Sequence, residues 1–322
     1  MVAPTIIGHA QQRAELERDL AQGNLTHAYV FAGPEHIGKS TIARWFAKEL
    51  LLTDVPEERK EEIARQIDCL IHPDFMVLDQ LWIEGQCEDW NTIAKHSNVP
   101  QQHRSKAPKL MKTNTISIDD VRVLQERLVE TGSSKYLVCV ITSLERMRDE
   151  AANAFLKMLE EPPPGRIFLL TTDNLENVLP TVVSRTRIVR FQRVGTGEMA
   201  SLLKECDTDT ARFILHAAQG APGIALSLRD DPDALRIARQ RHEQAKSVWA
   251  SRTLAQRLKL LKPLLERGKE ADAYLLHLAL ALREEPEVTH AKERALAKLV
   301  ASLQTNGHRE LLVQRFGMNI EN

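Results

Sequence analysis

The chain has 322 residues, which predicts two or three domains at about 100–200 residues per domain. Its formal net charge is −1, from 43 Lys and Arg against 44 Asp and Glu. This balance excludes a uniformly basic nucleic-acid coat and an acidic disordered chain. Aromatic residues make up 5% of the sequence, too few for a β-sandwich or barrel rich in Tyr and Trp.

The four cysteines, Cys69, Cys87, Cys139 and Cys206, are too scattered for a paired-cysteine zinc site or a disulfide framework. Their spacing favours a reducing, intracellular setting. No apolar run approaches the roughly 20 residues that cross a bilayer, and the N-terminal segment lacks the pattern of a signal peptide. We therefore expect a cytoplasmic protein with no membrane partner.

Helix and strand patterns alternate over the first 194 residues. Helices are expected at residues 9–22, 40–52, from 56 onward, 116–130 and 150–159. Strands are expected at 27–32, within 73–81, and at 136–141, 167–171 and 189–191. Several of these strands are continuous apolar runs, which is typical of strands buried on both faces. The alternation predicts a parallel sheet covered by helices.

The strand patterns stop after Gly195. Two or three short helices are expected over 197–230, and longer helices from Pro232, with breaks near Pro263, Gly268, Pro286 and Gly307. We therefore expect an α/β domain over 1–194, a small helical domain over 195–231 and a helical C-terminal domain over 232–322.

A basic segment without acidic residues lies at 95–114 and contains five Lys and Arg. Its composition is typical of a mobile loop. Lys106, Lys109 and Lys112 are candidate contacts for DNA phosphates. The alternative, which the composition favours, is a solvated insertion with no DNA contact.

Residues 33–40, GPEHIGKS, fit the phosphate-loop pattern G-x-x-x-x-G-K-[ST] in full, between a predicted strand and a predicted helix. Gly33 and Gly38 allow the backbone to curl around phosphate oxygens, and the helix N-terminus directs free N–H groups at them. Lys39 is expected to reach the β- and γ-phosphates, and Ser40 to ligate Mg²⁺. The alternative is an accidental glycine-rich turn, or a genuine loop that no longer hydrolyses nucleotide.

Hydrolysis also needs an acid at the end of a second strand, often followed by a glutamate that orients the attacking water. The best candidate strand, 136–141, is followed by Thr142 and Ser143, neither of which is a general base at neutral pH. The nearest acid, Glu145, lies further along the chain. This pattern predicts nucleotide binding without efficient turnover.

Several segments together resemble one family, the delta-prime subunits of the bacterial DNA polymerase III clamp loader, which are AAA+ proteins. The segments are residues 27–51, 72–75, 116–128, 149–172 and 179–191. The most specific are the run AANAFLKMLEEPP and the pattern LP-x-x-x-SR that follows it. The resemblance covers most of 1–230, and the C-terminal third matches only in length and helicity.

The resemblance implies an AAA+ P-loop α/β domain with a parallel sheet, a small helical lid and an all-α C-terminal collar that forms oligomers. It implies a nucleotide site, with ATP and Mg²⁺ as candidate ligands, made of Gly33, Gly38, Lys39, Ser40, Thr41 and the polar sensor residue Thr172 (or Thr171). It also implies that Arg185, in Ser184-Arg185-Thr186, is an arginine finger for ATP bound by a neighbouring subunit. Without the family, Arg185 would be expected to be a solvated arginine, as Arg187 and Arg190 are.

The sequence departs from the family pattern at several positions. Thr186 replaces a cysteine, and Ile224 stands where ATPase members often have an arginine. Only Cys69 precedes His72-Pro73-Asp74, where many relatives have a four-cysteine zinc module, so no zinc is expected there and His72 is expected to be structural or solvated. Thr142, Ser143 and Ile224 all replace expected catalytic groups, which implies weak or absent ATPase activity of the chain itself.

The expected function is that of a DNA polymerase III holoenzyme component, in which this subunit completes a neighbour's ATP site. Its partners would be gamma/tau-like and delta-like subunits, with the sliding clamp and primed DNA handled through the complex. One alternative is a hydrolysing motor of the gamma/tau type. A stand-alone P-loop kinase is disfavoured because 179–191 resembles an intersubunit motif.

Overall fold

The computed structural model describes residues 6–69, 72–78, 116, 118–129, 132, 134–285, 289–305 and 307–320. The basic segment at 95–114, with Lys106, Lys109 and Lys112, lies outside the described residues, as does Cys87. Tertiary contacts divide the chain into two compact units. The first comprises Met1–Glu198 and Gly220–Pro222, and the second Met199–Gln219 and Gly223–Asn322. The finer division into three domains stays a prediction.

The first unit contains a parallel five-stranded sheet with the strand order β2-β3-β4-β1-β5. The strands are β1 (Ala28–Ala32), β2 (Phe75–Leu78), β3 (Leu137–Ile141), β4 (Arg166–Thr172) and β5 (Arg187–Arg190). All residues of β1, β2 and β3 are buried, as the continuous apolar runs predict. The expected α/β fold with a parallel sheet is confirmed.

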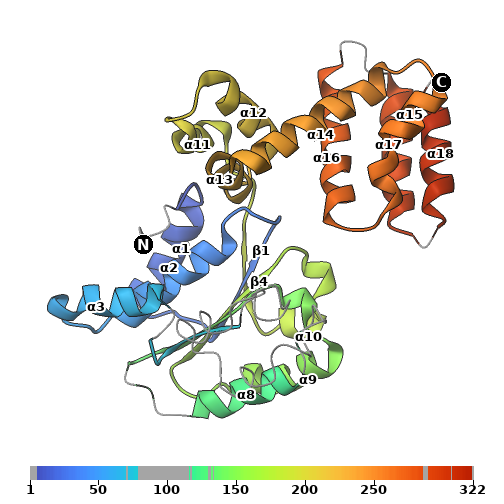
Figure 1. Cartoon of the computed structure of the whole chain (residues 1–322). Coiled ribbons are helices and arrows are strands. Elements are labelled where there is room, and N and C mark those ends of the chain that lie inside the picture. The colour runs from blue at the N-terminus through green and yellow to red at the C-terminus, as the bar shows by residue number, and fades with distance from the viewer. Residues whose placement is uncertain are drawn as a thin grey trace. The chain divides into compact units, whose positions relative to one another are not determined.

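Helices cover both faces of this sheet (Figure 1). They are α1 (Ala10–Gln22), α2 (Lys39–Leu52), α3 (Glu57–Asp68), α8 (Ile118–Val129), α9 (Asp149–Glu160) and the short α10 (Pro180–Val183). The alternation along β1 shows the two faces. Tyr29 meets Phe46 of α2 edge to face, with ring centroids 5.5 Å apart, whereas Val30 packs in one buried cluster with Phe155 of α9 and Leu124 of α8.

The carboxyl ends of three neighbouring strands meet at one edge of the sheet. Ala32, the last residue of β1, lies beside Thr172 of β4 on one side and Arg190 of β5 on the other. In open parallel sheets, ligands bind outside this edge. The loop that follows β1 is therefore placed where a nucleotide site is expected.

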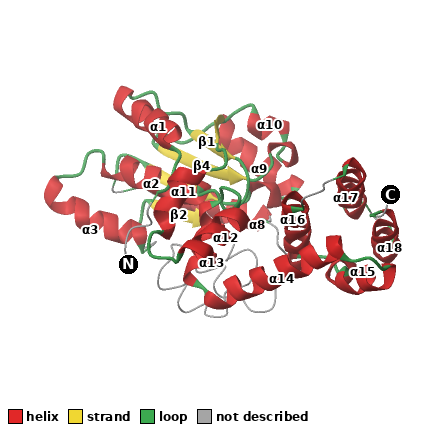
Figure 2. Cartoon of the chain, turned by 90° about the horizontal axis from the view of Figure 1, so that it is seen from above, coloured by secondary structure: helices red, strands yellow, loops and turns green. Residues whose placement is uncertain are grey.

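Beyond β5 the described residues form only helices and loops (Figure 2). The helices are α11 (Thr196–Ala200), α12 (Thr208–Ala218), α13 (Pro222–Asp230), α14 (Pro232–Ala250), α15 (Leu254–Leu260), α16 (Lys269–Glu284), α17 (His290–Leu303) and α18 (Arg309–Asn319). None of the helices in the described part of the chain is long and apolar enough to cross a membrane.

Side-chain caps begin several helices of the second unit. Asp207, Asp231, Thr253 and Thr289 each accept a hydrogen bond from a backbone N–H in the first turn of the helix that follows. The break before α15, at 251–253, was not among the expected breaks. A threonine followed three residues later by Gln256 is a signal that could have predicted it.

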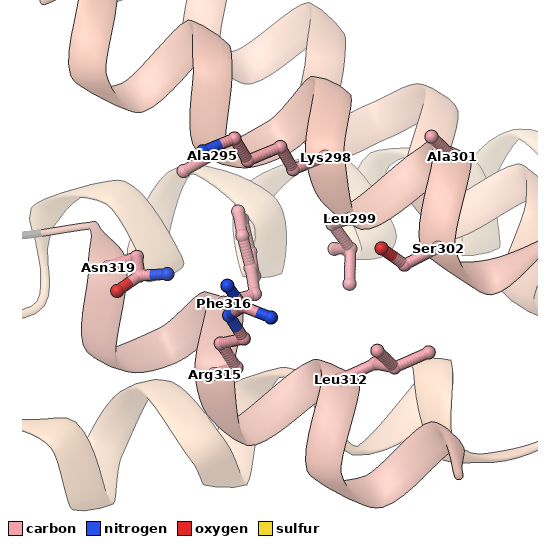
Figure 3. Close-up of a pocket in the computed structure, with 9 residues that line it drawn as sticks. All are labelled: Ala295, Lys298, Leu299, Ala301, Ser302, Leu312, Arg315, Phe316 and Asn319. Atoms are coloured by element: carbon pink, nitrogen blue, oxygen red, sulfur yellow. The ribbon is translucent and has the colours of Figure 1, made fainter. Parts of the chain in front are cut away.

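The helices α14 to α18 share one buried core in the second unit. Trp249 belongs to this core, and its indole N–H donates to the Leu278 carbonyl at 3.0 Å. Between α17 and α18 lies a cavity of about 220 Å³, which Figure 3 shows with Phe316 and Arg315 on one wall and Lys298 and Leu299 on the other. Its lining mixes apolar and cationic side chains.

Candidate functional site

The phosphate loop connects β1 to α2 in a conformation that requires both of its glycines. Gly33 has φ 157° and Gly38 has φ 100°, within the range that L side chains rarely adopt. A Cβ at Gly33 would lie 2.3 Å from the Phe191 carbonyl oxygen, so no side chain fits there. At Gly38 no atom would obstruct a Cβ, and only the backbone conformation requires glycine.

Lys39 is the first residue of α2, and its side chain is 7% exposed. Its ammonium donates to the carbonyls of Gly33 (2.7 Å) and Pro34 (2.6 Å) and to Asp173 Oδ1 (2.6 Å). An ammonium has three N–H donors, so these three acceptors use all of them. The structure therefore holds the charge of Lys39 inside the loop rather than in solvent.

Ser40 is exposed and Thr41 is half-buried in the first turn of α2. The first turn of a helix presents backbone N–H groups without intrahelical partners and the positive end of the helix dipole. Together with the loop glycines, these groups fit an ATP phosphate chain, and the exposed Ser40 hydroxyl fits a magnesium ligand. The structure thus brings together Gly33, Gly38, Lys39, Ser40 and Thr41 as expected.

Thr172 ends β4 beside the phosphate loop, and its carbonyl accepts from the Gly33 N–H at 3.2 Å. The side chain is fully buried, and its hydroxyl donates to the Asn174 carbonyl and accepts from the Asn174 N–H. The neighbouring Thr171 accepts from the Ser143 N–H at 3.1 Å. The Thr172 hydroxyl is therefore used within a turn, and the residue that reaches Lys39 is the next one, Asp173.

Sequence reasoning missed Asp173. In the structure β4 and β1 are neighbouring strands, so the first acid after β4 lies beside the loop after β1. Strand patterns do not give the order of the strands in the sheet, and Lys39 and Asp173 are far apart in the sequence. The contact could be predicted only if the strand order were known.

Thr142 and Ser143 follow β3 directly, as expected, at the same edge of the sheet. The Thr142 hydroxyl donates to the Leu78 carbonyl at 3.3 Å and is buried. Ser143 has φ 57°, a left-handed conformation at the start of the short turn Leu144–Arg146. The two residues directly after β3 are therefore not acidic. The nearest acid, Glu145, lies further along the chain, within this turn.

Arg185 lies directly after α10 and Ser184, with its side chain 36% exposed. Its guanidinium contacts Glu160 Oε1 at 2.8 Å, and it donates to the Thr181 carbonyl at 3.0 Å and to the Ser184 hydroxyl at 3.3 Å. The Thr186 hydroxyl donates to the Val183 carbonyl. Arg185 is therefore held at the surface by a carboxylate and by its own turn.

Arg187 is not a solvated arginine, and that expectation was wrong. Its guanidinium contacts Glu15 Oε1 at 2.7 Å and Asp19 Oδ2 at 2.6 Å, both on α1, and lies over the Tyr29 ring. The hydrogen bond that Arg187 donates to Glu15 raises the pKa of Arg187; burial opposes this and Asp19 adds to it. Arg187 thus joins α1 to β5. The Arg190 side chain is exposed, as expected.

His72 is buried in the turn before β2, where its Nδ1 accepts from the Asp74 N–H at 3.2 Å. Burial lowers the pKa of His72, opposed by Asp74. Asp74 in turn accepts from the Ser134 N–H at 2.8 Å. These partners fit a structural role for His72.

Cys139 is buried in β3, and burial raises the pKa of its thiol.

Comparisons with known proteins give the family to which the chain is similar. The family described as "DNA polymerase III, delta subunit" matches residues 8–195. DNA polymerase III subunit gamma/tau of Mycobacterium tuberculosis is 28% identical over 234 residues, which is 70% of this chain and 36% of that protein. DNA polymerase III subunit delta' of Haemophilus influenzae is 32% identical over 105 residues, 32% of this chain and 31% of that protein.

The chain thus spans about a third of the length of the first of these relatives. Among solved structures, a DNA polymerase III gamma subunit-related protein from Thermotoga maritima is 18% identical, with a TM-score of 0.46, covering 95% of this chain and 98% of that one. The family match covers more than half of the chain. It includes the phosphate loop, the carboxyl ends of β3 and β4, and Arg185. The chain therefore belongs to the DNA polymerase III delta-subunit family.

Proposed function

We propose that the chain is a delta-prime-like clamp-loader subunit that completes the ATP site of a neighbouring subunit and supports ATP-driven loading of a sliding clamp onto primed DNA. The observation that supports this most is the end of β3. Thr142 and Ser143 stand where an ATPase needs acids, and the Thr142 hydroxyl is buried against the Leu78 carbonyl. A hydroxyl at that place cannot take a proton from water at neutral pH.

The arginine finger role of Arg185 requires it to leave its own surface and reach a partner's phosphate. Its ion pair with Glu160 is half-exposed, and pairs of this kind contribute only about 0.2–1 kcal/mol. A triphosphate is a stronger acceptor for the planar fork of a guanidinium. The Arg185 guanidinium can therefore exchange Glu160 for a neighbour's ATP at a small energetic cost. In that position its permanent positive charge would lie beside the phosphoryl group that is transferred.

The phosphate loop supports nucleotide binding by this chain as well. Gly33, Gly38 and the first turn of α2 would surround the phosphates, with Lys39 on the β- and γ-phosphates and Ser40 on Mg²⁺. Thr41 and Thr172 border this position. Bound Mg²⁺ would neutralise phosphate charge. Because no acid follows β3, we propose that ATP stays bound without efficient hydrolysis.

Assembly through the C-terminal helices is supported by exposed apolar side chains on the second unit. Leu311 and Met318 of α18 are 62% and 60% exposed, and Val300 of α17 is 38% exposed. Residues seven apart lie on one face of a helix, so Leu311 and Met318 form a stripe. We propose gamma/tau-like and delta-like subunits as the partners, with Lys106, Lys109 and Lys112 as candidate DNA contacts.

A hydrolysing motor of the gamma/tau type is the second candidate. Two observations favour it: the complete phosphate loop, and the similarity to gamma/tau subunits over 70% of this chain. The two functions differ in a direct way, since a motor hydrolyses ATP in its own site and a delta-prime-like subunit does not.

The two proposals separate in one experiment. The purified chain is first assayed alone for ATP hydrolysis, with and without primed DNA. The chain is then assembled with gamma/tau-like and delta-like subunits whose phosphate-loop lysines are replaced, except in the subunit that adjoins Arg185. Single-turnover hydrolysis in that complex reports on one ATP site, and it is compared between the unchanged chain, Arg185→Ala and Arg185→Lys.

We expect no turnover above background from the chain alone, and a loss of about 10³-fold in the complex with Arg185→Ala. Arg190→Ala is the matched control, because its side chain is exposed and near the same segment, and it should leave the rate unchanged. Turnover by the chain alone at about 1 s⁻¹ or more would favour the motor. An unchanged rate with Arg185→Ala would exclude the finger.

A further inference from the structure

Three metal-binding side chains converge in the second unit, each from a different helix. His216 is on α12, His242 is on α14, and Glu284 is the last residue of α16. His216 Nε2 lies 3.0 Å from Glu284 Oε1, and His242 Nε2 lies 3.2 Å from both carboxylate oxygens. The three ligand atoms all lie within 4.8 Å of one another.

The two nitrogen–oxygen separations are close to those in the coordination sphere of a tetrahedral ion. With metal–nitrogen and metal–oxygen bonds of about 2.0–2.1 Å, two ligand atoms of a tetrahedron are about 3.3 Å apart. The nitrogen–oxygen distances of 3.0 and 3.2 Å are close to that value. The three groups can therefore share one ion with small side-chain movements.

The His216 ring supplies a second observation. Its Nε2 is buried and forms no hydrogen bond, even though Glu284 Oε1 is 3.0 Å away. A buried ring nitrogen that makes no hydrogen bond and lies beside a carboxylate oxygen is an arrangement that a cation shared by the two atoms would satisfy.

The surrounding charges leave one carboxylate oxygen available. Lys246 Nζ lies 2.8 Å from Glu284 Oε2, so it binds the oxygen that faces away from His216. Glu284 Oε1 lies within 3.2 Å of the Nε2 atoms of both His216 and His242, so this oxygen is placed between the two imidazoles.

The site is open on one side. His242 is 3% exposed, whereas the Glu284 side chain is 36% exposed and borders a cavity of about 600 Å³ together with Phe213 and Arg239. Three protein ligands with an open fourth position are typical of zinc sites that keep a water molecule. Two imidazoles and a carboxylate favour Zn²⁺ over Mg²⁺ and Ca²⁺, which prefer oxygen ligands.

We infer that His216, His242 and Glu284 bind one divalent transition-metal ion, with Zn²⁺ the best match, and that this ion joins α12 to α14 and α16. The inference does not depend on the proposed clamp-loader role, because no residue of the phosphate loop or of the Arg185 segment takes part. It differs in place and ligands from the cysteine module that the sequence lacks.

The test uses the full chain, produced without a histidine tag and treated with a chelator. Calorimetric titration with Zn²⁺ gives the stoichiometry and affinity, and thermal unfolding is followed with and without Zn²⁺. We expect one equivalent to bind and the unfolding midpoint to rise. Co²⁺ in place of Zn²⁺ should show the absorption of a tetrahedral ion without a thiolate charge-transfer band, which excludes the cysteines as ligands.

His216→Ala, His242→Gln and Glu284→Gln should each weaken binding by about 100-fold, since even outer partners of metal ligands typically change affinity by ~10–100-fold. His290→Ala is the matched control, because His290 is 92% exposed and pairs only locally with Glu293. Circular dichroism of the chelated variants checks their folding. Unchanged Zn²⁺ affinity in a folded His216→Ala/Glu284→Gln variant, or no binding at about 100 µM Zn²⁺, would overturn the inference.

Discussion

Lys39 Nζ and Asp173 Oδ1 are 2.6 Å apart, which joins the first residue of α2 to the residue directly after β4. The same ammonium binds two carbonyls of the phosphate loop. A phosphate that enters the loop must therefore replace at least one of these acceptors around Lys39. The Asp173 carboxylate opposes binding in two ways, because it neutralises Lys39 and would repel the phosphates.

Asp173→Asn should therefore bind ATP more tightly, by about tenfold or ~1.4 kcal/mol, within the range of a charge-assisted hydrogen bond. The dissociation constant of a fluorescent ATP analogue measures this. Glu176→Gln is the matched control, since Glu176 is exposed on the same loop and should not change the affinity. Weaker binding by Asp173→Asn would mean that Asp173 assists the nucleotide rather than competing with it.

The sequence predicted the elements of this site but not the contacts between them. Buried parallel strands appear as apolar runs, and the phosphate-loop pattern is local, so β1, β3, β4 and the start of α2 could all be placed. Lys39 and Arg187 pair with residues that are far from them in the sequence. Asp173 and α1 become their neighbours only through the strand order and the helix packing, which no local sequence pattern predicts.

The two glycines of the phosphate loop should differ in what their substitution costs. Gly33→Ala combines left-handed strain with a Cβ 2.3 Å from the Phe191 carbonyl oxygen, a backbone atom that cannot move freely. Gly38→Ala meets strain alone, about 1–2 kcal/mol. We expect Gly33→Ala to lower the free energy of unfolding by about 3 kcal/mol or more. Equal losses in urea unfolding would show that the loop shifts to accommodate the methyl group.

Arg185 and Arg187 are two residues apart, and we expect their removal to lower the free energy of unfolding by very different amounts. Arg187→Ala leaves Asp19 without its cation, and the Asp19 side chain is 9% exposed, so the loss should be about 3 kcal/mol. Arg185→Ala breaks a half-exposed pair with Glu160 and should cost less than about 1 kcal/mol.

Urea unfolding of both variants measures this difference. A loss for Arg185→Ala as large as that for Arg187→Ala would give Arg185 a structural role and weaken its assignment as a finger. The expected result, a stable chain with Arg185→Ala, is also what makes the hydrolysis assay in the complex interpretable.

Leu311 and Met318 test the proposed assembly surface on α18. Leu311→Glu/Met318→Glu should abolish association with the partner subunits, because it places two carboxylates in an apolar contact. The free energy of unfolding of the isolated chain should change by less than about 1 kcal/mol, since both side chains are more than half exposed.

Size-exclusion chromatography of the mixed subunits measures association. Arg236→Gln/Lys204→Gln is the control for charge, because it lowers the net charge by the same two units at exposed positions elsewhere in the same unit. Normal assembly of the α18 variant would place the interface on another surface of this unit.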